Sequence, residues 1–246
     1  MIYYHTTHPT RVAGKSLDNG LAHGWYRIGQ SFSTTDLIVV QEQLLPVFWL
    51  RIDLKRYTPS RSARRILKKN QDFSVAILPF KITPEIENLF AAYRAGIDFS
   101  MSETVAEYLL DNEQYNAYDT YLIEVRDKDR LVAVGYFDVG KKTNTGILHF
   151  YDHALGDFSL GKFLFLLELE YGLTHGFDYY YMGYLCKGDT KFDYKLFADR
   201  NSTEVYLRAL NRWLPYNAMD KKISRWGEKI IDTCRRSYRL VPTEEQ

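Results

Sequence analysis

The sequence predicts an α+β protein with a mixed sheet flanked by helices and a smaller α/β region packed on it at the N-terminus. Between residues 121 and 184 the apolar pattern runs strand, strand, strand, helix, strand. The helix in this order, residues 160–175, is so densely apolar that it must be buried against a sheet. We therefore expect one region at residues 1–83 and a second at residues 84–246, which carries extra helices at its end.

Composition excludes several classes of function but does not identify one. Hydrophobic residues make up 46% of the 246 residues and aromatic residues 15%, which is ample for a packed core. The net charge is +1, so nucleic acid could be held only by a local basic patch. Cys186 and Cys234 form no CxxC pair, which argues against a disulfide framework or a zinc knuckle. No apolar run reaches eighteen residues and the first residues lack a signal pattern, so we expect a soluble cytoplasmic protein with no membrane partner.

The elements before the sheet follow from local signals. Residues 1–45 resemble loops and short strands, and residues 45–54 alternate as a strand. A helix follows, with Thr58 as its expected N-cap, Pro59 at its first position and Asn70 at its end. Residues 84–118 read as two helices, 85–95 and 102–111, the second capped by Ser102.

The predicted sheet contains strands at residues 121–125, 131–139, 147–151 and 178–184. The buried helix before the last strand ends at Gly176, a residue suited to a left-handed helix end. Two further helices are expected after the last strand, at residues 203–214 and 219–238. The second of them is basic and amphipathic.

The helix after residue 58 presents a single sign of charge. No acidic residue occurs between Lys55 and Lys69, whereas an ordinary solvated helix face mixes signs. Its spacing places four cations on one face: Arg61, Arg64, Arg65 and Lys68. Such a face can lie along a phosphate backbone, and a plain solvated surface is the equally weighted alternative.

The last core strand and the loop after it carry phenols and cations. Alternation directs Tyr179 and Tyr181 to one side of the strand and Tyr180 and Tyr184 to the other, so at most one pair faces a site. Ligands in α/β proteins usually lie at the carboxyl end of a strand. The loop returns three more such residues to that end: Lys191, Tyr194 and Lys195. This combination suits a polyanionic or acyl-bearing substrate.

A third candidate group ends the strand at residues 147–151. Tyr151 and Asp152 would lie at the mouth of the sheet, where the carboxylate could orient or deprotonate an amine. The alternative is a turn aspartate, and His153 is better explained as a surface histidine. His149 and His153 could be a metal pair only with a third ligand, which the neighbouring sequence lacks, so no metal is expected.

The segment before the buried helix contains Gly156 and Gly161, which could cradle phosphate at a helix start. Acetyl-CoA enzymes of this kind usually show Arg or Gln, two residues, Gly, one residue and Gly, and that spacing is missing. A tight strand-to-helix turn is the structural alternative. The reading as an acetyl-CoA site is therefore weakened.

Together these stretches resemble the arginyl/leucyl-tRNA–protein transferase family, whose catalytic region is GNAT-like. The specificity of the resemblance lies in the joint order and spacing of the segments. The matching segments, in family order, are residues 24–30, 50–53, 57–65, 132–135 through 138–139, 150–152, 159–161, 181–184 and 194–195.

The resemblance implies that the free α-amine of a protein or peptide attacks the ester carbonyl of an aminoacyl-tRNA and that the ribose hydroxyl leaves. An α-amine has a pKa of about 7.7–8.0, so a weak base suffices. The activated ester supplies the driving force, and no cofactor is needed. Family acceptors begin with an acidic residue, so a cationic pocket is expected.

The expected roles follow from this resemblance. Catalysis falls to Asp152, Tyr184 and Lys195, substrate binding to Tyr151, Tyr181, Lys191 and Tyr194, and tRNA binding to Arg61, Arg64, Arg65 and Lys68. Family cysteines near the N-terminus and before residues 50–53 are missing here, as is a Cys-Pro pair before Tyr194. The alternatives are a GNAT-type N-acyltransferase that uses acyl-CoA and an inactive binding module of the same fold.

Overall fold

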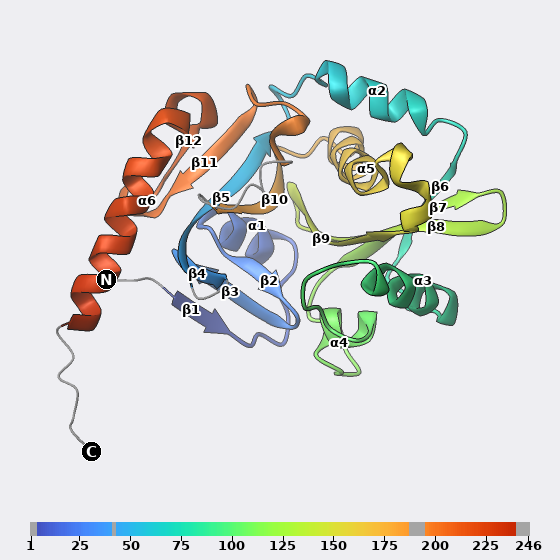
Figure 1. Cartoon of the computed structure of the whole chain (residues 1–246), viewed down its shortest axis with the longest axis horizontal. Coiled ribbons are helices and arrows are strands. Elements are labelled where there is room, and N and C mark those ends of the chain that lie inside the picture. The colour runs from blue at the N-terminus through green and yellow to red at the C-terminus, as the bar shows by residue number, and fades with distance from the viewer. Residues whose placement is uncertain (1–3, 41–42, 187–194, 240–246) are drawn as a thin grey trace.

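A computed structural model describes residues 4–40, 43–186 and 195–239, and it contains two sheets (Figure 1). The small sheet has the strand order β1-β3-β2, with bounds β1 (Tyr4–Thr7), β2 (Tyr26–Ile28) and β3 (Ser31–Thr35). The large sheet has nine strands in the order β12-β11-β5-β10-β9-β8-β7-β6, with β4 paired to β5. Its strands are β4 (Leu37–Val40), β5 (Gln43–Asp53), β6 (Ser74–Pro79), β7 (Thr120–Asp127), β8 (Arg130–Val139), β9 (Thr143–Tyr151), β10 (Tyr179–Cys186), β11 (Thr203–Leu207) and β12 (Arg212–Pro215).

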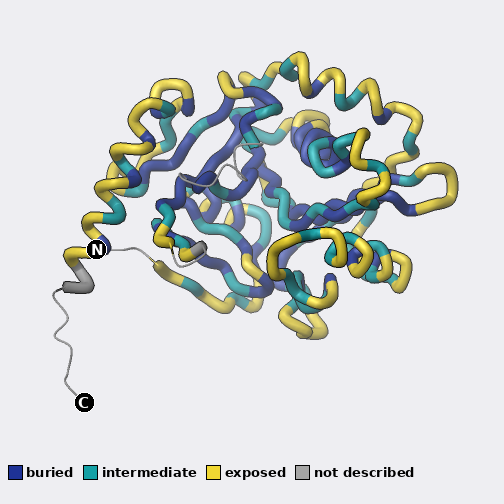
Figure 2. The backbone as a smooth tube through the Cα atoms, viewed as in Figure 1, coloured by how far each residue is buried: buried dark blue, intermediate teal, exposed yellow. Residues whose placement is uncertain are grey.

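Helices cover both faces of the large sheet. One face packs against α2 (Arg61–Lys69), α5 (Leu160–Thr174) and α6 (Tyr216–Arg239). The other face packs against α3 (Pro84–Ala95) and α4 (Val105–Leu110), and against the small sheet with α1 (Lys15–Ala22). Figure 2 shows α5 enclosed, whereas α2 exposes its outer side to solvent. The predicted α+β class, with a mixed sheet flanked by helices, is confirmed.

The proposed division at residue 83 stays a prediction. Strands β5 and β6 precede that residue, yet they belong to the same sheet as the strands that follow it. β5 lies between β11 and β10, and β6 pairs with β7. The two regions therefore share one sheet, and a boundary between them would cross its hydrogen bonds.

Strands β9 and β10 pair in parallel, and they diverge soon after they meet. Their pairing in the described residues runs from Tyr179 opposite Thr143 to Tyr181 opposite Thr145. Beyond that point β10 continues against β5, where Tyr184 lies opposite Trp49. We call the divergence the strand fork, formed by Thr145 and Gly146 on β9 and by residues 181–183 on β10.

A bulge in β10 corrects the expected side-chain alternation. Gly183 has a φ of +80°, a left-handed conformation that favours glycine, and the register with β5 shifts between Tyr181 and Tyr184. One extra residue reverses the side on which all later side chains lie. Tyr184 therefore shares the face of Tyr181, because their partners on β5 are two residues apart. The expected pairing of Tyr180 with Tyr184 is wrong.

Residues 203–214 form strands instead of the expected helix. β11 and β12 pair as a hairpin through a short 3-10 turn, Arg208–Leu210, and β11 also pairs with β5. Thr203 and Val205 are both buried, which is the two-residue spacing of a strand. The charged residues of the turn interrupt this pattern in the sequence. Residues 216–239 are helical as expected.

Two helix starts and two elements differ from expectation. The N-cap of α2 is Ser60, whose hydroxyl accepts the amide of Ala63, and not Thr58. Thr104, rather than Ser102, caps α4. Helix α1 and edge strand β6 were not expected, because both are short and their sequences carry weak periodicity.

Candidate active site at the strand fork

Two glycines leave room for side chains at the strand fork. A Cβ atom on Gly146 would stand 2.4 Å from Oε2 of Glu168 and 2.8 Å from the hydroxyl of Tyr180. A Cβ atom on Gly183 would stand 3.3 Å from Nζ of Lys195. Polar groups from α5 and from the segment after β10 therefore occupy the space above these glycines. The fork is a place where functional side chains converge.

Tyr26 from the small sheet closes one side of the fork. Its hydroxyl donates a hydrogen bond to the carbonyl oxygen of Gly146. Its ring stacks on Trp49, with centroids 5.8 Å apart and an interplanar angle of 29°. Burial raises the pKa of Tyr26 well above its usual value of 10.0, which keeps the phenol protonated as a donor. Tyr26 thus joins the small sheet to the backbone of β9 just after its last pair with β10.

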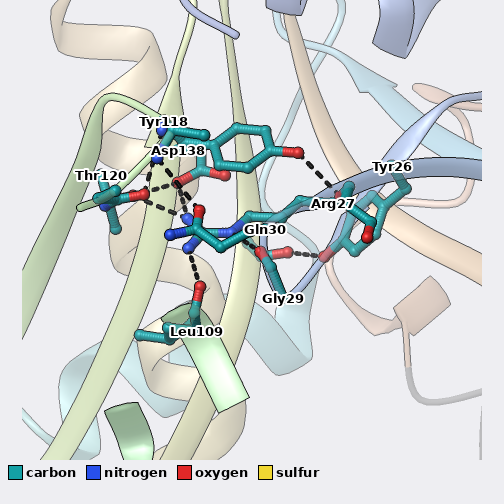
Figure 3. Close-up of polar contacts among 12 residues, drawn as sticks. Tyr26, Arg27, Gly29, Gln30, Leu109, Tyr118, Thr120 and Asp138 are labelled. Atoms are coloured by element: carbon teal, nitrogen blue, oxygen red, sulfur yellow. Dashed lines mark hydrogen bonds and ion pairs between the residues drawn. The ribbon is translucent and has the colours of Figure 1, made fainter. Parts of the chain in front are cut away.

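A buried ion pair fixes the segment that carries Tyr26 (Figure 3). Arg27 and Asp138 have fully buried side chains, and Nη1 lies 2.9 Å from Oδ1. The same guanidinium donates to the hydroxyl of Thr120 and to the carbonyl of Leu109. Burial raises the pKa of Asp138, while Arg27 acts in the opposite direction. The bonded guanidinium locks β2 onto β7 and β8, and with it the neighbouring Tyr26.

Lys195 places an ammonium group at the end of β10. Its Nζ donates to the carbonyl oxygen of Tyr184 at 2.8 Å and lies 5.2 Å from the centroid of that ring. Burial lowers the pKa of Lys195 to about 8, and Cys186 opposes the shift. The ring of Tyr184 meets Trp49 edge-on at 5.5 Å, and burial raises its pKa to about 12. Near neutral pH this corner holds a poorly hydrated cation beside a neutral phenol.

The opposite face of the fork holds a buried carboxylate. Glu168 on α5 is 0% exposed, and its Oε2 accepts a hydrogen bond from the hydroxyl of Tyr180 at 2.6 Å. Its Oε1 lies 2.7 Å from Nε2 of His149 on β9. Sequence reasoning weighed His149 only as a metal ligand and did not single out Glu168. The signal in the sequence was a glutamate directly after the apolar run 163–167 of this helix, which carries a second glutamate at Glu170.

An arginine-lined hollow of about 610 Å³ opens at the start of α2. Asp199 also lines it, but its carboxylate accepts the amides of Thr58 and Asn201 and is bonded into the wall. Leu196 and Phe197 border the hollow directly after Lys195 in the chain. The cations of the hollow are Arg56, Arg61, Arg64 and Arg200.

The structure brings some of the expected tRNA-binding residues together. Arg61 and Arg64 line the hollow, whereas Arg65 and Lys68 lie on the exposed side of α2 beyond it. Arg56 belongs to the basic stretch before the predicted helix but was not assigned to tRNA binding, and Arg200, far along the chain, joins it only in the fold. The prediction that α2 binds tRNA stays untested.

The expected substrate-binding residues are spread over several environments. Tyr181 is buried, with its hydroxyl 3.3 Å from Nη1 of Arg51. Tyr151 packs its ring against Tyr93 at the far end of β9. Lys191 and Tyr194 lie outside the described residues.

Asp152 has structural partners for both of its carboxylate oxygens. Oδ2 pairs with Arg130 at 2.6 Å, and Oδ1 accepts the amide of Ala154, which caps the short 3-10 helix His153–Phe158. The hypothesis that Asp152 orients the amine remains untested, and these contacts give it no support. Lys195 and Tyr184, in contrast, lie together at the fork.

The sheet opens between two parallel strands, with a lysine at the opening, and an arginine-lined hollow borders the residues that follow this lysine. Residues 85–200 match the family model described as arginine-tRNA-protein transferase, C terminus. An aspartate/glutamate leucyltransferase of Campylobacter jejuni is 31% identical over 199 residues, which cover 78% of this chain and 80% of the relative. The chain belongs to this tRNA–protein transferase family.

Further relatives align over shorter lengths. A protein of the same name from Leptospira interrogans is 25% identical over 71% of this chain and 70% of its own. One from Thiobacillus denitrificans is 29% identical over 59% of this chain, and the match spans 62% of that relative's length. A C-terminal domain of a putative lysylphosphatidylglycerol synthetase from Agrobacterium fabrum gives a TM-score of 0.42 at 14% identity, over 62% of this chain and 52% of that one. A score of that size carries no conclusion about the fold.

Within residues 4–40, 43–186 and 195–239, no helix is both long and apolar enough to cross a bilayer.

Proposed function

We propose that this protein transfers an amino acid from aminoacyl-tRNA to the N-terminal α-amine of a protein or peptide that begins with Asp or Glu. One observation carries the proposal. The short turn of residues 195–197 borders two cationic places at once: Lys195 reaches the fork, and Leu196 and Phe197 line the arginine hollow. A polyanionic donor and an acidic acceptor could therefore meet at this turn. The names of the relatives support the same acceptor class.

The hollow suits the phosphate backbone of the donor. One guanidinium can donate two parallel hydrogen bonds to the oxygens of a phosphate. Several guanidinium groups in one hollow can therefore hold successive phosphates. Arg61 and Arg64 come from the first turns of α2, while Arg56 and Arg200 come from the segments on either side. Arg65 and Lys68 continue the positive potential along the helix. The acceptor end of a tRNA that lies along this face would reach toward Lys195.

The fork suits the acidic side chain of the acceptor. The ammonium of Lys195 is buried and poorly solvated. A carboxylate that approaches it therefore has little water to displace from the cation. Attraction between the two charges is stronger there than in water, because the local dielectric is lower. A neutral N-terminal residue brings no carboxylate to this ammonium. This difference supplies a physical basis for a preference for Asp or Glu.

The chemistry needs positioning more than activation. The donor is already an activated ester, and the amine is partly neutral at cellular pH. Holding both groups in register lowers the barrier by removing translational and rotational freedom. Tyr184, a neutral phenol with a pKa of about 12, could donate a hydrogen bond to the developing oxyanion. We propose that the reaction takes place in the cytoplasm, where charged tRNA is found.

The proposal is tested with labelled leucyl-tRNA and arginyl-tRNA and with peptides that begin with Asp, Glu or Ala. Transfer to the Asp and Glu peptides, with little to the Ala peptide and none to N-acetylated controls, is the expected result. Failure with both donors, together with acetylation of the same peptides from acetyl-CoA, would contradict the proposal and favour an N-acyltransferase. Failure in both assays would favour the inactive binding module.

A further inference from the structure

We infer that His149 accepts the proton of the attacking α-amine, and that Glu168 and Tyr180 are positioning residues that hold its imidazole. The inference rests on the proposed transfer reaction and adds to it the group that handles the proton. It assigns a chemical role to a cluster that neither the family resemblance nor the sequence analysis used.

The hydrogen bonds of Glu168 define the protonation of His149. Glu168 is fully buried, and a buried carboxylate is stable only when donors satisfy its oxygens. Tyr180 donates to Oε2 at 2.6 Å, and the partner of Oε1 is Nε2 of His149 at 2.7 Å. Because a carboxylate only accepts, Nε2 must carry its hydrogen toward Glu168. The imidazole is therefore held in one tautomer.

The other ring nitrogen is available for chemistry. In that tautomer Nδ1 of His149 carries a lone pair. No residue in the described part of the chain donates a hydrogen bond to Nδ1, and the side chain is 19% exposed. A partly exposed histidine, whose one nitrogen is fixed by a buried carboxylate and whose other nitrogen accepts no hydrogen bond from the described residues, has the arrangement of a general base.

The sequence makes room for this cluster at two glycines. Gly135 lies opposite His149 on β8, where a Cβ atom would stand 3.3 Å from Cδ2 of the imidazole. Gly146 leaves the space that Oε2 of Glu168 fills. Apolar residues surround Glu168 along α5, and an apolar side chain there would avoid the cost of burying a carboxylate. The buried glutamate thus indicates a role other than packing.

The cluster lies at the fork. His149 follows Gly146 by three residues on β9, beyond the point where β10 diverges. The titratable groups of the cluster come from two neighbouring elements, Glu168 from α5 and Tyr180 from β10. The charge of Glu168 also contributes to the raised pKa of Tyr26 on β2. β8 contributes only Gly135 at this position.

The proposed step is balanced. The amine nitrogen attacks the ester carbonyl carbon, so that a C–N bond forms and the C–O bond to the ribose breaks. The excess proton on the nitrogen passes to Nδ1 of His149. The imidazolium, stabilised by Glu168, then gives this proton to the departing ribose oxygen. The products are the new peptide bond and a tRNA with a free hydroxyl.

The test measures transfer kinetics and pH profiles for three variants of the full chain with the active donor. H149Q is expected to lower kcat about 100-fold or more, with the Kd for aminoacyl-tRNA unchanged. E168Q is expected to lower kcat about tenfold and to move the acidic limb of log(kcat/KM) to lower pH, since the buried charge that stabilises the imidazolium is lost. The matched control is H175Q, an exposed histidine at the end of α5, which should behave as wild type.

Two results would overturn the inference. One is an H149Q variant that transfers at the wild-type rate with an unchanged pH profile. The other is an E168Q variant that is less stable but keeps the wild-type pH profile, because a purely structural Glu168 would behave in that way. Absence of transfer by the wild type would contradict the proposed function itself, and the inference would fall with it.

Discussion

The hydroxyl of Tyr26 donates a hydrogen bond to the carbonyl oxygen of Gly146, a residue 120 positions later in the chain. The small sheet therefore completes the hydrogen bonding of the large sheet at the point where β9 and β10 diverge. This bond, together with the stacking of Tyr26 on Trp49, closes one side of the fork. The N-terminal segment is part of the candidate site and not an appendage to it.

Tyr26→Phe should weaken both stability and transfer. The substitution leaves the Gly146 carbonyl without its donor, which costs about 1–3 kcal/mol for a buried acceptor. Denaturant unfolding measures that loss, and the transfer assay should show a fall in kcat larger than any change in donor affinity. Tyr4→Phe, an exposed tyrosine of the same sheet, is the control. Equal stability of wild type and Tyr26→Phe would show that the bond contributes nothing.

The ion pair between Arg27 and Asp138 should behave as a buried pair. Arg27→Met leaves a fully buried carboxylate without its cation and should destabilise the protein by about 3–5 kcal/mol. The double variant Arg27→Met with Asp138→Leu removes both charges and should recover part of that loss. Equilibrium unfolding of the single and double variants measures this recovery of stability. A double variant less stable than Arg27→Met alone would contradict the prediction that the unpaired carboxylate causes the loss.

Lys195 should make stability depend on pH in the alkaline range. Its pKa in the folded protein is about 8, against 10.5 for an ordinary lysine, so the unfolded chain binds more protons between these values. Folding stability should therefore rise as pH increases from about 8 to about 10.5. Lys195→Met should be more stable than wild type at pH 7, and the advantage should shrink across that window. Unfolding at several pH values measures this, with the exposed Lys221→Met as control.

The same lysine should set the pH dependence of acceptor binding. Only its protonated form attracts a carboxylate, so KM for an Asp-initiated peptide should rise as pH increases through about 8. KM for an Ala-initiated peptide should change less over that range, since it has no side-chain carboxylate. A parallel change for both peptides would remove Lys195 from acceptor recognition.

The arginine hollow should matter more for tRNA than the rest of α2. Arg61→Ala with Arg64→Ala should weaken tRNA binding about tenfold and reduce the slope of log Kd against log salt by roughly 2. Arg65→Ala with Lys68→Ala, on the same helix but outside the hollow, should have a smaller effect. Filter binding at several salt concentrations compares the pairs. Equal effects of the two pairs would mean that the helix face, and not the hollow, binds.

Much of the framework could be predicted from the sequence, because strong periodicity and helix boundaries fix local structure. The strands that became β7, β8 and β10 and the buried helix α5 were expected near their observed positions. The strand nature of residues 203–214 was missed because a three-residue turn interrupts the alternation. The face of Tyr184 was wrong because a single bulge at Gly183, which no periodicity reveals, reverses the alternation.

The site could be predicted only where its residues are close in sequence. Lys195 and Tyr184 were expected together and do lie together. Tyr26 and His149 were not assigned to the site, since each depends on a partner that only the fold brings near: Gly146 for the phenol and Glu168 for the imidazole. Asp152 was expected to orient or deprotonate the amine, and that role stays a prediction; the partner of its carboxylate, Arg130 on the neighbouring strand, is known only from the fold.

Mass spectrometry of an Asp-initiated peptide, incubated with this protein and with leucyl-tRNA or arginyl-tRNA in turn, tests the central claim most directly. The account predicts that the peptide gains one amino-acid residue at its α-amine from at least one donor, and that an N-acetylated copy gains none. An unchanged peptide mass with both donors, or a gain on a lysine side chain instead, would contradict it.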